Sequence, residues 1–115
     1  WVWKVLFKYG VRKMNKYIYV TQDDIDNGIK FDNRLCPVAL SLKRYLHLFP
    51  CPNGHPPSEV RVRTTSVELG YGNCPYAICN NRFYTHYRLS KFVSTQIIVF
   101  DSKGIMELFR FKLLD

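Results

Sequence analysis

Hydrophobic and polar residues alternate in several short segments of this chain, a pattern typical of β-strands with one buried face. The expected strands cover residues 16–21, 59–69, 82–89 and 108–113. The second of them loses its alternation after Thr64. We therefore expect one long strand with a bulge there, since a bulge shifts the side chains that follow to the opposite face.

Helical spacing is clearest over about residues 37–48, where apolar residues recur on one stripe. Pro37 suits the first helical position, because its φ is already fixed and its missing N–H would have no partner there. Pro50 ends the helix.

A single helical turn is expected over Asp23–Asp26, with Thr21 as its cap. Asn27-Gly28 should stop it, because both residues tolerate left-handed backbone.

Residues 90–103 allow two interpretations. Ser90 can cap a helix that ends at Gly104, whereas Gln96–Phe100 also suits a strand followed by a hairpin turn. With the helix, the element order becomes βαββαβ, which is the ferredoxin-like order. We therefore expect one small α+β domain over 14–115, mainly an antiparallel sheet with one or two helices on one face. The alternative has a hairpin in place of the second helix.

Two motifs stand out in the first half of the chain. The first motif is Thr21-Gln22-Asp23-Asp24-Ile25-Asp26-Asn27-Gly28, and the second is Cys36-Pro37-Val38-Ala39-Leu40-Ser41-Leu42-Lys43-Arg44. Together they resemble a family of small uncharacterised phage and phage-like metagenomic proteins. The resemblance covers residues 17–46 closely and 90–113 loosely, and it omits the loops 50–58 and 70–81. It implies the helix interpretation of 90–103, Met14 as the natural start, and no known activity.

The chain is basic, with 17 Lys and Arg against 9 Asp and Glu and a formal net charge of +8. Residues 1–13 hold Lys4, Lys8, Arg12 and Lys13 and no acid. This segment also interleaves aromatic residues, so a secretory signal, a membrane-surface peptide and sequence upstream of Met14 are all open interpretations. We favour the last one and expect the segment to be dispensable for folding.

Cysteine and histidine suggest a metal site. Cys51, His55, Cys74 and Cys79 lie in two Pro-containing loops and could bind one structural zinc ion as a Cys₃His set. The spacings are looser than in the commonest zinc knuckle, so free thiols remain open. A Cys51–Cys74 or Cys74–Cys79 disulfide is open too, if the protein is exported. Cys36 starts the helix without a neighbouring base, so we expect a buried residue rather than a nucleophile.

One face of the predicted sheet combines basic and aromatic residues, as in proteins that stack single-stranded bases. The candidate nucleic-acid-binding residues are Arg61, Arg63, Tyr84, His86 and Arg88. A solvated face, or one covered by a partner, is the alternative.

Enzyme motifs are missing from the sequence: it contains no Gly-rich phosphate loop, nucleophile elbow or His-Glu-x-x-His. We therefore expect a non-enzymatic phage-like accessory protein that binds a host or phage protein, with nucleic-acid or nucleotide binding as the alternative. No run of 18 apolar residues predicts a transmembrane segment. The expected location is the host cytoplasm or the virion.

Overall fold

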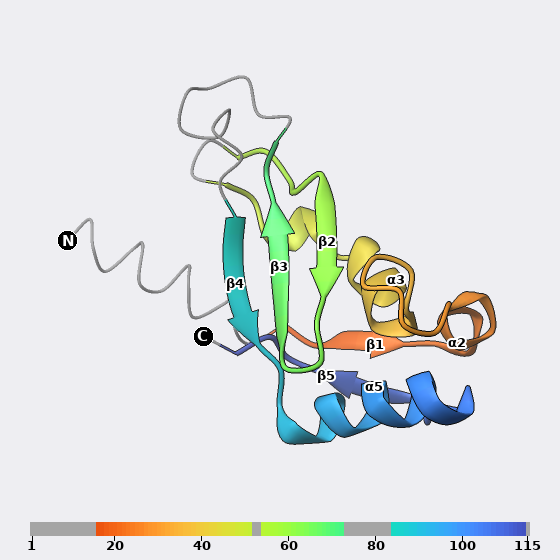
Figure 1. Ribbon diagram of the computed structural model, residues 1–115. Helices are drawn as coiled ribbons and strands as arrows, with labels where there is room; N and C mark the ends of the chain where they lie inside the picture. The colour runs from red at the N-terminus through yellow and green to blue at the C-terminus, as the bar shows by residue number, and fades with distance from the viewer. Residues whose placement is uncertain (1–15, 52–53, 73–83, 115) are drawn as a thin grey trace.

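The chain folds as an α+β structure of short antiparallel strands and helices, which confirms the expected class. The computed structural model describes residues 16–51, 54–72 and 84–114, so residues 1–13 lie outside it. Figure 1 shows the elements in chain order: β1 (Ile18–Val20), α2 (Gln22–Asn27), α3 (Pro37–Lys43), the 3-10 helix η1 (Leu46–Leu48), β2 (Glu59–Val62), β3 (Ser66–Gly70), β4 (Tyr84–Arg88), α5 (Lys91–Lys103) and β5 (Phe109–Phe111).

The strands form two sheets among the described residues. β1 pairs with β5, whereas β2, β3 and β4 follow one another as an antiparallel meander. The expected ferredoxin-like order is therefore wrong, because segment 59–69 supplies two strands. The Arg63 N–H donates to the Ser66 carbonyl over 2.8 Å and closes a hairpin turn. The loss of alternation after Thr64 marks this reversal of the chain rather than a bulge.

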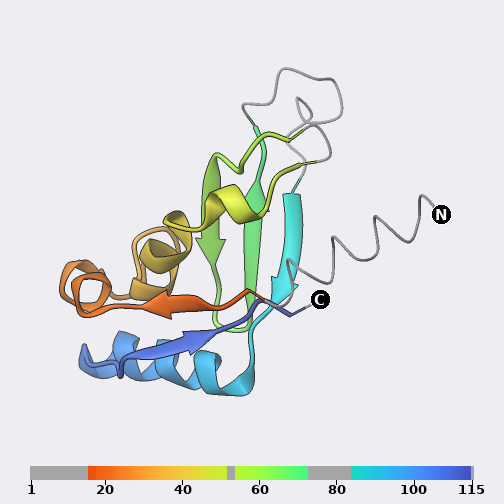
Figure 2. The same ribbon diagram turned by 180° about the vertical axis from the view of Figure 1, so that it is seen from behind.

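Helix α3 lies against both sheets, because it contacts β1 on one side and β2 on the other. Its apolar stripe is fully buried: Val38, Ala39 and Leu42 have no exposed surface. The α-helix ends at Lys43, earlier than expected, and the chain continues as the 3-10 turn η1. Figure 2 shows α3 and η1 on the same side of the three-stranded sheet, with α5 below the β1–β5 pair.

Helix α5 confirms the helix interpretation of 90–103. The Ser90 hydroxyl accepts from the Val93 N–H over 3.4 Å. Gly104 ends the helix with φ +73°, a left-handed conformation that favours glycine. Val93, Ile97 and Phe100 form its buried side, and this side outweighs the β-propensity of the Ile-Ile-Val-Phe run.

Helix α2 is capped as expected but ends differently. Thr21 and Asp24 form a reciprocal capping box, in which each side chain accepts from the backbone N–H of the other. Gly28 is extended, with φ −73°, so the left-handed stop predicted at Asn27-Gly28 is wrong. A Cβ at Gly28 would stand 2.6 Å from the ring of Pro37. Close packing of α2 against the start of α3 therefore requires glycine here.

Candidate nucleic-acid interface

The three-stranded sheet gathers the residues that the sequence predicted for nucleic-acid binding. Its buried side holds Val60, Val62, Val67 and Leu69, and alternation turns the predicted residues to the opposite side. That outer face carries Arg61, Tyr84, His86 and Arg88, with Arg63 directly after β2.

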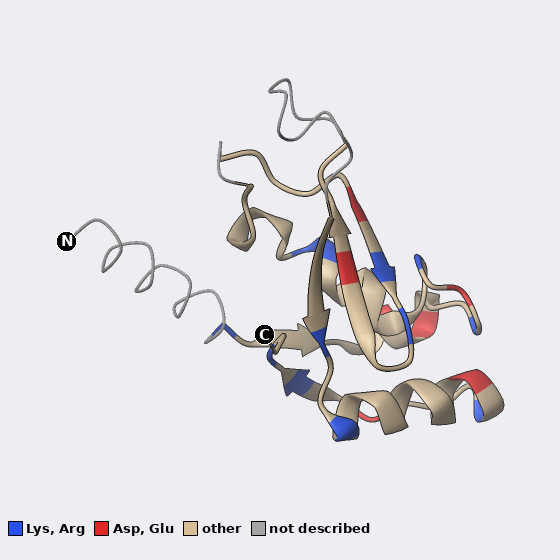
Figure 3. Cartoon of the chain, turned by 60° about the vertical axis from the view of Figure 1, so that its left-hand side comes forward, with Lys and Arg blue, Asp and Glu red and all other residues tan. Residues whose placement is uncertain are grey.

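Two glutamates lie among these cations, and the prediction from the sequence did not include them. Arg61 Nε lies 3.0 Å from Glu59 Oε1, and Arg63 Nε lies 3.0 Å from Glu68 Oε1. The Arg61 guanidinium also stands 5.9 Å from the centre of the Tyr84 ring. Figure 3 shows this mixture as blue and red on β2 and β3. Arg61 and Arg63 are thus paired with carboxylates, which weakens the attraction of the face for phosphate.

Among the described residues, a second surface is basic without such acids. The β1–β5 pair buries Ile18, Val20 and Phe111, and alternation places the residues between them on the solvent side. We call this side the ribbon face; it consists of Tyr17, Tyr19, Arg110 and Lys112. Figure 3 shows blue on β5 and on the chain that enters β1.

Both charged groups of the ribbon face lie over one exposed aromatic ring, that of Tyr17. The centre of the Tyr17 ring is 4.2 Å from the Arg110 guanidinium and 4.6 Å from the Lys112 ammonium. Arg110 is directly opposite Tyr19 in the strand register. The pKa of Arg110 is raised above its ordinary value, mainly by a hydrogen bond to Tyr19 and next by the nearby Tyr17. Neither Arg110 nor Lys112 forms an ion pair with a carboxylate within the described residues.

The free edge of β1 is closed by two side chains, which hold the ribbon face in place. The Tyr19 N–H donates to the Tyr45 hydroxyl over 3.4 Å, and the Tyr19 carbonyl accepts from Arg44 Nη2 over 2.8 Å. Arg44 also donates to both carboxylate oxygens of Asp24. Backbone groups at this edge therefore have partners, and the ribbon presents its side chains rather than an unpaired strand edge.

Stacking and phosphate contact are the two interactions that this arrangement offers. An aromatic ring provides a surface for any base, and a guanidinium or ammonium beside it meets the phosphate that follows. Sequence reasoning missed the ribbon face although both strands were expected. Alternation indicates that Tyr17 shares a face with Tyr19 and Arg110 with Lys112, but it does not reveal that β1 and β5 are partners.

Half of the predicted metal site lies in the described residues. Cys51 Sγ and His55 Nδ1 are 3.9 Å apart, and the Cys51 N–H donates to the His55 carbonyl over 2.8 Å. Gly54, with φ +86°, allows this tight loop. Cys74 and Cys79 lie outside the described residues. Within the part of the chain that the structure describes, no three potential ligands cluster.

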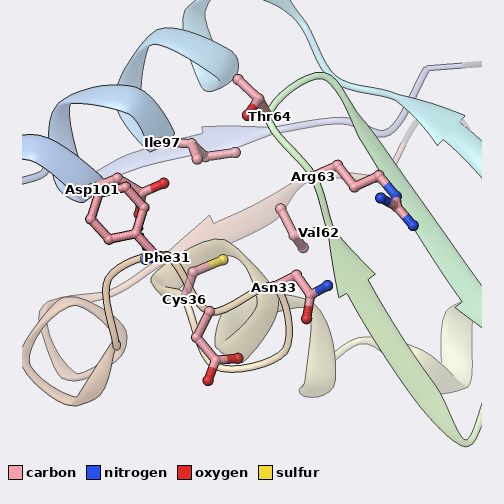
Figure 4. Close-up of a pocket in the computed structure, with 9 residues that line it drawn as sticks. Phe31, Asn33, Cys36, Val62, Arg63, Thr64, Ile97 and Asp101 are labelled. Carbon is pink, nitrogen blue, oxygen red and sulfur yellow. Dashed lines mark hydrogen bonds between the residues drawn. The ribbon is translucent and has the colours of Figure 1, made fainter.

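Cys36 faces a hollow of about 280 Å³ between the 31–33 loop, the β2–β3 turn and α5 (Figure 4). Its side chain is buried, as expected. Burial raises the pKa of this thiol, and the charges of Asp101 and Asp32 raise it further, against the lowering effect of the N–H groups of Ala39 and Val38. A thiol that holds its proton is a poor nucleophile, so this hollow has no chemistry of that kind.

Comparisons of the chain with protein-family models, with curated proteins and with solved structures found no match. The resemblance to phage proteins therefore stays a prediction. No helix in the described part of the chain is long and apolar enough to cross a membrane.

Proposed function

We propose that this chain is a non-enzymatic binding module for single-stranded nucleic acid, and that the ribbon face is its contact surface. One observation carries the proposal: the exposed Tyr17 ring lies beneath two cations, Arg110 and Lys112, that no carboxylate neutralises in the described structure. Single strands match this surface, because their bases are open to stacking and their phosphates recur beside each base. The net charge of +8 favours association with any polyanion.

The double variant Arg110→Gln/Lys112→Gln tests this proposal. We expect it to bind a fluorescein-labelled oligothymidylate of about twelve nucleotides roughly tenfold more weakly than the wild type. Loss of two phosphate contacts should also flatten the slope of log affinity against log salt by about 1.4. Fluorescence anisotropy at several salt concentrations gives both values.

Two double variants serve as controls for this experiment. Arg34→Gln/Lys103→Gln removes the same charge from exposed positions elsewhere. Arg61→Gln/Arg63→Gln removes it from the outer face of the three-stranded sheet, where both arginines pair with glutamates. We expect both controls to lose less than about threefold, since they change only the general field of the protein. If all three variants lost the same affinity, total charge alone would explain binding. That result would contradict a localised contact surface.

A structural zinc ion is a second part of this proposal. Zn–S and Zn–N bond lengths place two ligands of a tetrahedral ion about 3.6 Å apart, and Cys51 Sγ lies 3.9 Å from His55 Nδ1. Cys74 and Cys79 would complete the set proposed from the sequence. The ion would join the loop before β2 to the chain that follows β3, and it would take no part in chemistry.

The zinc content of protein purified without a metal-binding tag tests this part. We expect about one zinc per chain in the wild type and in Cys36→Ala, and loss of zinc in Cys51→Ser, because a hydroxyl is a poor substitute for a thiolate ligand. Cys36 serves as the matched control, since it is also buried. A wild-type chain without zinc would overturn this part of the proposal.

A further inference from the structure

A hollow of about 450 Å³ continues the ribbon face beyond Tyr19. It lies where β1 ends and β5 begins, and its lining includes Tyr19, Thr21, Gln22, Leu108 and Arg110. Tyr19 and Arg110 are directly opposite each other in the register. One alternation step further along each strand, Thr21 and Leu108 fall on the same face. The hollow is therefore a continuation of the surface that holds Tyr17.

The lining of this hollow is mainly apolar and open to solvent. Leu108 is 62% exposed and Tyr19 is 49% exposed. Arg110 is among the lining residues, and its guanidinium lies over the Tyr17 ring. An occupant that is flat and apolar on its faces, and that carries negative charge on the side of Tyr17, suits this lining. A single nucleobase with its neighbouring phosphate has this chemistry.

We infer that the hollow holds one unstacked base of a single strand, with Tyr19 and Leu108 against the base and Arg110 on the adjoining phosphate. This inference rests on the proposed function. It adds that recognition includes burial of a base, so single strands should be preferred to duplexes, whose bases are already stacked. At the rim, the Gln22 amide donates to Asp26 over 2.9 Å, which leaves its oxygen for the edge of a base.

The variant Leu108→Ala tests base burial, with Ile105→Ala as its control. Ile105 is 60% exposed and does not line the hollow, so both changes remove a similar amount of exposed apolar surface. The probes are the oligothymidylate and an abasic deoxyribose phosphate oligomer of equal length. We expect Leu108→Ala to weaken oligothymidylate binding about fivefold to tenfold and to leave abasic binding unchanged. Ile105→Ala should change neither.

Three other results would overturn the inference. If Leu108→Ala behaves like Ile105→Ala while Arg110→Gln/Lys112→Gln still binds weakly, the ribbon face stands and the hollow holds no base. If Leu108→Ala lost the same affinity for both probes, Leu108 would contact the sugar-phosphate chain and not the base. A wild-type chain that binds neither probe, yet binds an acidic peptide containing Phe or Tyr, would replace the base with an aromatic side chain and would overturn the proposed function as well.

Discussion

The variant Leu42→Ala should lower the free energy of unfolding by about 2–5 kcal/mol, because it leaves a cavity that the surroundings fill only in part. Leu42 has no exposed surface, and its helix packs against both β1 and β2. A cavity at this position therefore weakens the packing of the two sheets at once. Chemical denaturation followed by circular dichroism gives the free energy of unfolding.

Leu108→Ala is the matched control, because it makes the same chemical change at a side chain that is 62% exposed. It should cost less than about 0.5 kcal/mol. If Leu42→Ala cost no more than Leu108→Ala, α3 would not be the element that joins the two sheets.

Asp24→Ala should lower the free energy of unfolding by about 2–3 kcal/mol, since it removes a cap and one partner of a partly buried ion pair. The Asp24 side chain is 5% exposed, and its carboxylate accepts from Arg44 and from the Thr21 N–H. Arg44 is itself 42% exposed, which limits the cost of leaving it without a partner. Asp26→Ala on the exposed side of α2 is the control and should cost less than about 0.5 kcal/mol.

The lowered pKa of Asp24 predicts that the stability of the protein depends on pH. Burial raises the pKa of Asp24, but the hydrogen bonds and charge of Arg44, together with the bonds to Thr21, outweigh it and hold the pKa below the ordinary value of 3.8. A group with a lowered folded pKa adds stability above its unfolded pKa and loses it as the pH falls through the folded value. Stability should thus fall below about pH 4, and less steeply in Asp24→Asn. Equal acid sensitivity of both proteins would contradict this role.

These contacts show what the two sequence motifs, Thr21–Gly28 and Cys36–Arg44, do in this chain. Asp24 of the first motif binds Arg44 of the second, and Gly28 of the first packs on Pro37 of the second. The motifs therefore encode the junction of α2, α3 and β1.

Local signals were enough to predict the helix caps at Thr21, Ser90 and Gly104, but they did not predict the strand pairings. Ser90 and Gly104 mark the ends of α5 in the sequence, because capping is decided within a few residues. The hairpin turn after β2 was mistaken for a bulge, since both interrupt alternation in the same way. Pairing of β1 with β5 joins segments about 90 residues apart, and no local pattern records such a contact. The ribbon face was missed for that reason.

Glu59 and Glu68 show why the sequence of a single strand does not give the charge of a sheet face. Arg61 and Arg63 read as a basic pair along β2, but cross-strand neighbours and same-strand neighbours decide the charge of a sheet face. Glu68 comes from β3 and pairs with Arg63, and Glu59 lies two residues before Arg61. The predicted surface is therefore assembled as expected and carries less charge than its arginines suggest.

We expect single-stranded nucleic acid to bind the ribbon face and not the three-stranded sheet. Titration of isotope-labelled protein with the oligothymidylate, followed through backbone amide chemical shifts, tests it most directly. We predict that the largest shifts fall on Tyr19, Arg110 and Lys112 and saturate with the anisotropy curve. Largest shifts on Arg61, Glu68 and His86 would place the ligand on the other sheet and contradict the claim, and so would a titration without shifts.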